Sequence, residues 1–180
     1  GQSLEDTLPE GVLTTEDALL IFLSLLTTVE YIHGQQVIHL DLKPDNIIIS
    51  WAGAGWRVKV IDFGIALYAN EQGDRFTPCV GTTLYSSPEQ IRVNPTLTYA
   101  SDIFSLGLIL YELLTGRRVF PAEHFTFATR YALAETPIEA TCPNGKVSGP
   151  LWAMLKACVA TNPGQRPTAT DLVHCLCEEL

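Results

Sequence analysis

Positive charge and long hydrophobic runs are both scarce in this chain of 180 residues. Lys and Arg number 11 against 20 Asp and Glu, which gives a formal net charge of −9 and a pI near 4.8. That balance argues against a surface that binds nucleic acid or an anionic membrane. The longest apolar runs, residues 18–29 and 103–114, are shorter than the roughly 20 residues that a membrane span needs. We therefore expect these residues to contact neither nucleic acid nor a membrane.

Metal-ligand spacing is lacking among the five cysteines, which are also an odd number. No apolar segment of the kind that directs secretion stands at the N-terminal end. We expect reduced thiols in a cytoplasmic protein, with Cys175 and Cys177 as buried apolar thiols rather than metal ligands. The chain begins at Gly1 rather than Met, so we expect it to be a piece of a longer protein.

The composition, 47% hydrophobic and 17% charged, is typical of one compact globular domain. Apolar residues recur every three to four positions over much of the chain, which predicts helices. Two helix starts carry capping residues: Ser3 precedes an acidic turn, and Thr14 has Asp17 three positions later. The helices are expected before Pro9, from Thr14 to Gly34, from Asp102 to Thr115 with Ser101 as the cap and Gly116 as the stop, and at residues 125–134, 150–160 and 170–179.

Strand-like patterns are confined to one short region. Residues 46–50 and 57–61 are rich in β-branched side chains and flank a turn that contains Gly, which predicts a hairpin. The expected fold class is therefore mainly α, α+β overall, with a helical body and a small β-hairpin. Residues 63–96 follow with several Gly and Pro and little periodicity, and we expect such a long irregular segment to be functional.

Chemistry-bearing residues gather in the stretch 37–50, which reads VIHLDLKPDNIIIS. Two acids, a lysine and an asparagine fall within six residues, although a turn fixed by Pro44 would account for part of the pattern. Residues 39–46 resemble the catalytic loop of protein kinases, H-x-D-L-K-P-x-N. The resemblance implies that Asp41 orients the substrate hydroxyl and accepts its proton, and that Lys43 neutralises the transferred phosphate.

A second motif, Asp62-Phe63-Gly64, follows sixteen residues after Asn46, at the end of the predicted hairpin. Taken alone, such a tripeptide is equally typical of a turn that leaves a hairpin. In the kinase resemblance, residues 62–64 form the magnesium-binding turn, where Asn46 and Asp62 hold Mg²⁺. Amide and carboxylate oxygens are the ligands that Mg²⁺ prefers. His39 and Phe63 are structural residues by the same resemblance.

Residues 81–89, GTTLYSSPE, resemble the G-T-x-x-Y-x-[AS]-P-E sequence that closes the activation segment of kinases. That segment would then run over residues 62–89. The resemblance implies that Thr82, Thr83 and Leu84 seat the backbone of the substrate.

Two later motifs extend the resemblance towards the C-terminal end. Residues 102–107, DIFSLG, resemble the opening of the central kinase helix, and residues 162–167, NPGQRP, resemble a late turn of the same domain. The resemblance implies a buried ion pair between Glu89 and Arg166, and it implies that Asp102 holds the backbone of the catalytic loop.

Taken in order over residues 1–180, the motifs resemble the C-terminal lobe of a eukaryotic-like protein Ser/Thr kinase, from the end of the hinge to the last helix. Lys43, with Thr82 placed to contact it, is typical of Ser/Thr rather than Tyr kinases. The family implies ATP and Mg²⁺ as cofactors, with Ile48 against the adenine. It implies a protein substrate and the enzyme's own N-terminal lobe as partners. Phrases of the sequence resemble both bacterial and eukaryotic kinases, so the source stays open.

The sequence departs from the family pattern in two respects. Leu40 stands where many kinases place arginine, so this position offers no cation to a phosphorylated activation segment, and we predict that phosphorylation of Thr77 is not the main switch. In addition, nothing resembles the Gly-rich loop, the strand lysine or its glutamate partner. The N-terminal lobe is therefore absent from these residues, and we expect this piece alone to transfer hardly any phosphate.

Two other functions remain alternatives. A pseudokinase or truncated kinase lobe would act as a protein-binding module, but the catalytic and metal residues are all intact. A small-molecule phosphotransferase would keep a loop like residues 39–46, but such enzymes lack a segment like residues 81–89.

Overall fold

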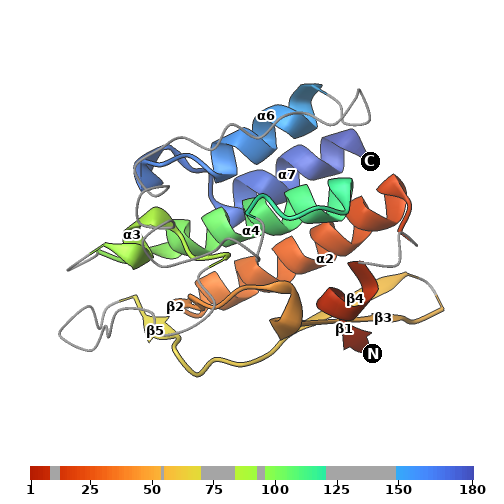
Figure 1. The fold of residues 1–180 in the computed structure, drawn as a ribbon, viewed down its shortest axis with the longest axis horizontal. Coiled ribbons are helices and arrows are strands. Elements are labelled where there is room, and N and C mark those ends of the chain that lie inside the picture. Colours follow the sequence, from red (N-terminus) through yellow and green to blue (C-terminus); the bar gives the residue numbers. More distant parts are fainter. Residues whose placement is uncertain (9–12, 54, 70–83, 93–95, 121–148) are drawn as a thin grey trace.

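The computed structural model describes residues 1–8, 13–53, 55–69, 84–92, 96–120 and 149–180, and its long helices form a layer beside a small sheet (Figure 1). In chain order the elements are β1 (Gln2–Ser3), α1 (Leu4–Thr7), α2 (Thr15–Gly34), β2 (Val37–Ile38), a 3-10 turn (Pro44–Asn46), β3 (Ile47–Trp51), β4 (Trp56–Val60), β5 (Leu67–Tyr68), α3 (Pro88–Ile91), α4 (Tyr99–Thr115), α6 (Gly149–Cys158), a second 3-10 turn (Pro163–Gln165) and α7 (Ala169–Glu179). The mainly helical fold with a small hairpin is thereby confirmed. The helix expected at residues 125–134 lies outside the described residues.

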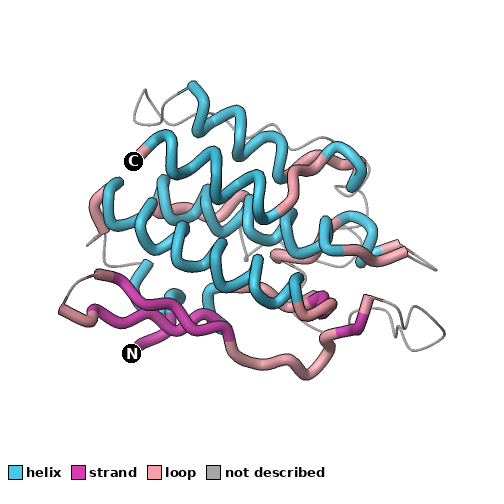
Figure 2. The backbone as a smooth tube through the Cα atoms, turned by 180° about the vertical axis from the view of Figure 1, so that it is seen from behind, coloured by secondary structure: helices cyan, strands magenta, loops and turns pink. Residues whose placement is uncertain are grey.

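α2 and α4 form the centre of the helical layer. α2 begins at the expected cap, where the Thr14 hydroxyl accepts a hydrogen bond from the N–H of Asp17 at 3.0 Å. In α4, residues 101–110 are all buried, which explains why that stretch is apolar nearly all round. α2 packs against α4 and α7, and α4 packs against α6. The four helices therefore lie side by side, as Figures 1 and 2 show.

α4 starts earlier than the sequence predicts. Its N-cap is Thr98 and its first residue is Tyr99, so the assignment of Ser101 as the cap was wrong. Ser101 lies in the first turn, fully buried, and its hydroxyl donates to the Glu89 carboxylate at 2.8 Å. The Ser101 hydroxyl, which the sequence suggested as a helix cap, therefore binds a residue twelve positions earlier instead. The predicted stop is confirmed, because Gly116 adopts the left-handed conformation with φ 66°.

The expected hairpin is present as β3 and β4, which pair antiparallel with Trp51 opposite Trp56. β1 adds a third strand on the other edge of β3, with Gln2 opposite Ile49. A strand of two residues has no periodic pattern, which is why the sequence does not predict it. The Trp56 indole N–H donates to the Asp17 carboxylate at 2.8 Å. This contact ties the hairpin to the first turn of α2.

A second, smaller ladder flanks the predicted catalytic loop. β2 and β5 pair antiparallel, with Val37 opposite Tyr68 and Ile38 opposite Leu67. The residues just before the loop therefore lie beside the residues that follow the motif at 62–64.

By length and composition alone, α2 is apolar enough to cross a membrane. In this fold Phe22, Leu25 and Leu26 of α2 are fully buried among the other elements. A helix at the centre of a globular core has the same length and hydropathy.

α4 and α6 approach one another closely at Gly107. A Cβ atom on Gly107 would lie 2.7 Å from the Cβ of Cys158 and 2.8 Å from Cγ1 of Val159. Neither distance leaves room for a methyl group, so the crossing requires glycine. Cys158 is completely buried there, and burial raises the pKa of its thiol to about 12.

The other two described cysteines differ from the expectation. Cys175 is half-buried and Cys177 is exposed, so the prediction of two buried thiols was wrong. α7 turns Leu172 and Leu176 into the core. Position 177 therefore points away from it, because successive helix residues are about 100° apart.

Candidate active site

The predicted catalytic loop is held by the buried carboxylate of Asp102 in α4. Its Oδ2 accepts from the N–H of His39 at 2.9 Å and its Oδ1 from the N–H of Leu40 at 2.8 Å, so the expected contact is present. Leu40 has φ 65°, a left-handed conformation that costs a non-glycine residue about 1–2 kcal/mol. Gln90 in α3 donates to the carbonyl of Leu40 at 2.8 Å. The turn that presents Asp41 is therefore fixed from two elements.

Asp41, Lys43 and Asn46 converge within this loop. The Nζ atom of Lys43 lies 2.9 and 3.2 Å from the two carboxylate oxygens of Asp41. The Nδ2 atom of Asn46 donates to Oδ2 of Asp41 at 2.8 Å and to its carbonyl at 2.9 Å. The side chains of Asp41 and Lys43 stay 26% and 22% exposed. A carboxylate and an ammonium group thus lie together within reach of solvent, where they can accept a proton and neutralise an anion.

His39 connects the loop to the turn at Asp62. Its Nε2 lies 3.2 Å from the carbonyl oxygen of Ile61, and its ring meets that of Phe63 edge-on, with centroids 4.7 Å apart. Burial lowers the pKa of the His39 imidazole, against the opposing effect of the Asp102 charge. The ring is therefore neutral at pH 7 and serves as packing between the two motifs.

The hairpin brings Asn46 and Asp62, the predicted magnesium ligands, to one end. The N–H of Ile61 donates to the carbonyl of Asn46 at 3.0 Å, which places Asp62 one residue from that contact. The amide nitrogen of Asn46 is engaged with Asp41, so the amide oxygen is the atom available to a cation. Asp62 is exposed, and its Oδ1 accepts from the N–H of Gly64 at 3.1 Å.

Both side chains offer hard oxygen donors, so they fit Mg²⁺. Within the part of the chain that the structure describes, no group of three or more His, Cys, Asp or Glu is arranged to hold a metal. An ion at Asn46 and Asp62 would therefore take its remaining ligands from phosphate and water oxygens, as Mg²⁺ commonly does.

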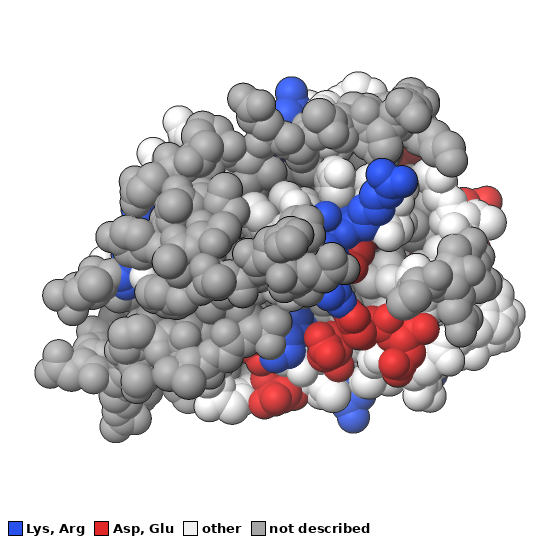
Figure 3. Space-filling view, viewed as in Figure 1, with Lys and Arg blue, Asp and Glu red and all other residues white. Residues whose placement is uncertain are grey.

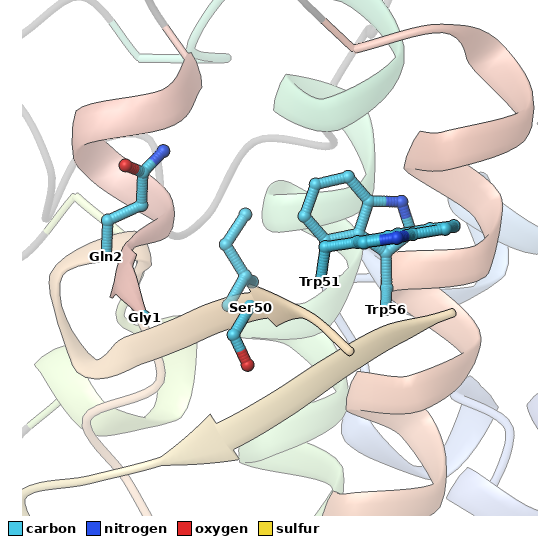
Figure 4. A pocket seen from close by; sticks show the side chains of 6 residues that line it. Gly1, Gln2, Ser50, Trp51 and Trp56 are labelled. Atoms are coloured by element: carbon cyan, nitrogen blue, oxygen red, sulfur yellow. The ribbon is translucent and has the colours of Figure 1, made fainter. Parts of the chain in front are cut away.

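Ile48, predicted to contact adenine, is half-buried on β3. Its Cγ2 would lie 2.7 Å from a Cβ on Gly1. Beside it, a pocket of about 450 Å³ opens between the start of the chain and the hairpin (Figure 4). The indoles of Trp51 and Trp56 meet edge-on there, with centroids 5.4 Å apart. In the register of β1 on β3, a residue before Gly1 would lie opposite Trp51, so this pocket lies where any preceding residues would run.

Glu89 and Arg166 form the expected buried ion pair. Two guanidinium N–H groups donate to the two carboxylate oxygens at 2.7 and 2.9 Å, and the side chains are 7% and 0% exposed. Burial alone would raise the pKa of Glu89, but the hydrogen bonds and charge of Arg166 outweigh it and leave the pKa below its ordinary value. The pair ties α3 to the turn that precedes α7.

The predicted substrate-seating residues are only partly described. Thr82 and Thr83 lie outside the described residues, as does Thr77. Leu84 is buried at 9% exposure, so any contact it makes with a substrate would come from its backbone.

Next to Leu84, an ionic network connects three elements. The Tyr85 hydroxyl donates to Glu112 in α4, and Arg118 contacts both Glu112, at 3.3 Å, and Glu5 in α1. Burial raises the pKa values of the Tyr85 hydroxyl and of the Glu112 carboxyl.

Sequence reasoning predicted none of the contacts by which five residues hold the site, although Tyr85 stands in the motif at residues 81–89 and Ser101 was expected as a cap. The five residues are His33, Tyr85, Gln90, Ser101 and Glu112. One of them carries a local signal, because Gln90 stands three positions after Ser87 and completes a capping box at the start of α3. The others act through contacts that no spacing in the sequence reveals.

Acidic side chains gather around α1 on the face shown in Figure 3, with basic side chains between and above them. As far as the described residues form it, this face lacks the uniformly basic surface that a nucleic-acid backbone attracts.

Comparison with known proteins shows which protein family the chain belongs to. The protein kinase domain family matches residues 1–176. The chain is 36% identical over 176 residues to a probable serine/threonine-protein kinase PknB of Bifidobacterium longum, which covers 94% of this chain and 24% of that protein. It is 34% identical to PknB of Mycobacterium tuberculosis, over 96% of this chain and 28% of the relative. It is also 34% identical to mitogen-activated protein kinase kinase 3 of Arabidopsis thaliana, over 96% of this chain and 33% of the relative.

The chain thus spans a quarter to a third of the length of these relatives. The family match nevertheless covers nearly all of its own residues, and hydrogen bonds and an ion pair connect the described parts of the motifs that carry the resemblance. The chain belongs to the protein kinase family and groups with its eukaryotic-like serine/threonine members.

Proposed function

We propose that the protein transfers the γ-phosphoryl group of ATP to a serine or threonine hydroxyl of a protein substrate. The observation that carries the proposal is the geometry of Asp41, whose carboxylate lies between Lys43 and Asn46 in a loop fixed by Asp102. Relatives named as serine/threonine-protein kinases support the choice of acceptor.

In this mechanism Asp41 orients the acceptor hydroxyl and takes its proton as the hydroxyl oxygen attacks phosphorus. Lys43 lies beside that carboxylate and offers its ammonium group to the transferred phosphate. Because Asn46 donates to Oδ2 of Asp41, the carboxylate keeps one orientation during the reaction. Catalysis then rests on positioning and charge, as phosphoryl transfer requires.

Asn46 and Asp62 would hold Mg²⁺, which supplies positive charge to the phosphate oxygens when it is bound. Ile48 would contact the adenine. Thr82, Thr83 and the backbone of Leu84 would seat the substrate. The remaining phosphate contacts would come from an N-terminal lobe, because a Gly-rich loop and a strand lysine do not occur in these residues.

A cytoplasmic location is part of the proposal. The thiols of Cys158, Cys175 and Cys177 are free, which suits a reducing compartment.

The proposal is tested by Asp41→Asn in the full-length protein that contains this chain. We expect turnover to fall by about 100-fold or more, because the amide cannot accept the proton, while the affinity for Mg-ATP changes little. Asp45→Asn is the matched control: Asp45 lies in the same loop but is exposed, and its variant should stay within about twofold of wild type. Near-normal turnover of Asp41→Asn would refute the assignment.

The same protein separates the alternatives by its acceptors. Phosphorylation of a serine- and threonine-containing peptide library supports the proposal. Transfer to aminoglycoside or choline-like acceptors alone would favour a small-molecule phosphotransferase, and no transfer to either would favour a binding module.

A further inference from the structure

A cavity of about 340 Å³ lies at the opposite side of α4 from the ionic network of Tyr85, where the C-terminal end of α2 meets the turn before α7 and the N-terminal end of α4. Figure 1 shows these three ends at the same edge of the helical layer. The volume falls in the range of pockets that hold small molecules. None of its lining residues belongs to the predicted catalytic loop or to the turn at 62–64.

The cavity is lined by apolar side chains and by two aromatic rings. Ile103, which is 1% exposed, and Pro167 supply apolar surface. The rings of His33 and Tyr99 lie together on another side, with centroids 4.7 Å apart and planes tilted by 36°. Such a lining favours a flat, apolar ligand body.

The charge offered to a ligand is negative. Glu30 lines the cavity, and the hydroxyl of Thr170 donates to its Oε1 at 2.6 Å. Arg166 also lines the cavity, but its side chain is 0% exposed and its guanidinium is paired with Glu89. The N-terminal end of α7 is closed by the reciprocal hydrogen bonds of Thr168 and Asp171, so it does not attract an anion.

From this lining we propose that the cavity binds a small aromatic cation, with the ring against His33 and Tyr99 and a protonated amine at Glu30. An amine at a half-buried carboxylate forms a charge-assisted hydrogen bond, which is the strongest polar contact that this lining offers. The site goes beyond the proposed kinase function and does not depend on it.

The cavity is also connected to the catalytic loop through one side chain. Nε2 of His33 lies 2.9 Å from Oδ2 of Asp102. The same oxygen accepts from the N–H of His39, and its partner oxygen accepts from the N–H of the strained Leu40. A ligand that contacts His33 therefore contacts a side chain that is hydrogen-bonded to the carboxylate that fixes this turn. We expect its binding to change the amide chemical shifts of His39 and Leu40.

The test is a titration of the isotope-labelled chain with phenethylamine, followed by amide NMR shifts. We expect saturable shifts at Ala100 and Ala169, which line the cavity, with a Kd of about 1 mM or tighter. The neutral analogue 2-phenylethanol should bind about tenfold more weakly. Absence of saturation at both amides up to about 10 mM phenethylamine overturns the site, and equal binding of the two compounds overturns the role of Glu30.

Matched variants locate the amine. Glu30→Gln should weaken phenethylamine binding about tenfold, whereas Glu16→Gln, the same change in the exposed first turn of α2, should leave it unchanged. An equal effect of both variants would point to the net charge of the chain and refute the site.

The connection is tested in the same spectra. In wild type, the shifts at His39 and Leu40 should saturate at the same concentration as those at Ala100. In His33→Phe, which keeps a ring but loses the contact with Asp102, the shifts at Ala100 should remain and those at the loop should vanish. His33→Gln serves the same comparison if the Phe variant does not fold. Loop shifts that persist in these variants refute the route through His33.

Discussion

Removal of one partner from the Glu89–Arg166 ion pair should destabilise the fold severely. Glu89→Gln keeps the size of the side chain but leaves the guanidinium of Arg166 uncompensated, with its side chain 0% exposed. Breaking a buried pair in this way costs about 3–5 kcal/mol. Arg166 also donates to the carbonyls of Ala100 at 2.7 Å and Ala160 at 2.8 Å. These contacts remain in the variant, so we expect the lower end of that range, about 3 kcal/mol.

The assay is equilibrium unfolding of the chain in urea, followed by circular dichroism. A loss of about 3 kcal/mol moves the midpoint down by about 1–2 M for a domain of this size. Glu178→Gln, the same change on the exposed part of α7, is the control and should leave the midpoint in place. A cost below about 1 kcal/mol for Glu89→Gln would be that of a surface pair and would refute the reasoning.

Acid adds an independent measurement on the same pair. The pKa of Glu89 is lowered in the folded state, so the stabilisation is present above the ordinary carboxyl pKa and is lost as the pH falls through the lowered value. Wild type should lose stability in that window more steeply than Glu89→Gln. Parallel acid profiles of the two proteins would contradict this.

Three further predictions concern the loop and its flank. Burial lowers the pKa of His39, so below about pH 6.5 the unfolded chain binds a proton that the folded chain does not. The free energy of unfolding should therefore fall below that pH, by at most about 1.4 kcal/mol per pH unit. When the free energy of unfolding in urea is plotted against pH, His39→Gln should flatten the curve. Asp102→Asn replaces one of the two carboxylate oxygens by an NH2 group, so one of the two buried N–H groups loses its acceptor and faces a donor instead. This should cost about 2–3 kcal/mol in the same assay, and a loss below about 0.5 kcal/mol would contradict it. Gln36 is exposed with φ 62°, so Gln36→Gly should raise the free energy of unfolding by up to about 1 kcal/mol, seen as a slightly higher thermal midpoint. A lower thermal midpoint would show that the left-handed residue is not strained.

Local patterns predicted the elements well where a short-range signal decides the structure. Thr14 and Asp17 marked the start of α2, and Gly116 marked the end of α4, because caps and left-handed stops are determined by a few neighbouring residues. The same reasoning failed at Ser101, whose hydroxyl is used by Glu89, twelve residues away in the sequence.

The candidate site divides in the same way. Asp41, Lys43 and Asn46 lie within one turn, so the motif alone brings them together. His33 is different: it stands 69 residues before Asp102, and its position in the last turn of α2 suggests only a favourable interaction with the helix dipole. Contacts of this kind depend on how the helices pack, which a single sequence does not encode locally.

The close contact at Gly107 fixes the position of α4 against α6. A methyl group there has to push α6 away or rotate α4, because Cys158 and Val159 already occupy the space. α4 carries Asp102 before Gly107 and Glu112 after it. A rotation of α4 would therefore move at once the carboxylate that holds the predicted catalytic loop and the carboxylate that binds Tyr85. If the protein has the proposed activity, substitutions of Gly107 should therefore lower it, although Gly107 lies outside both the predicted catalytic loop and the turn at 62–64.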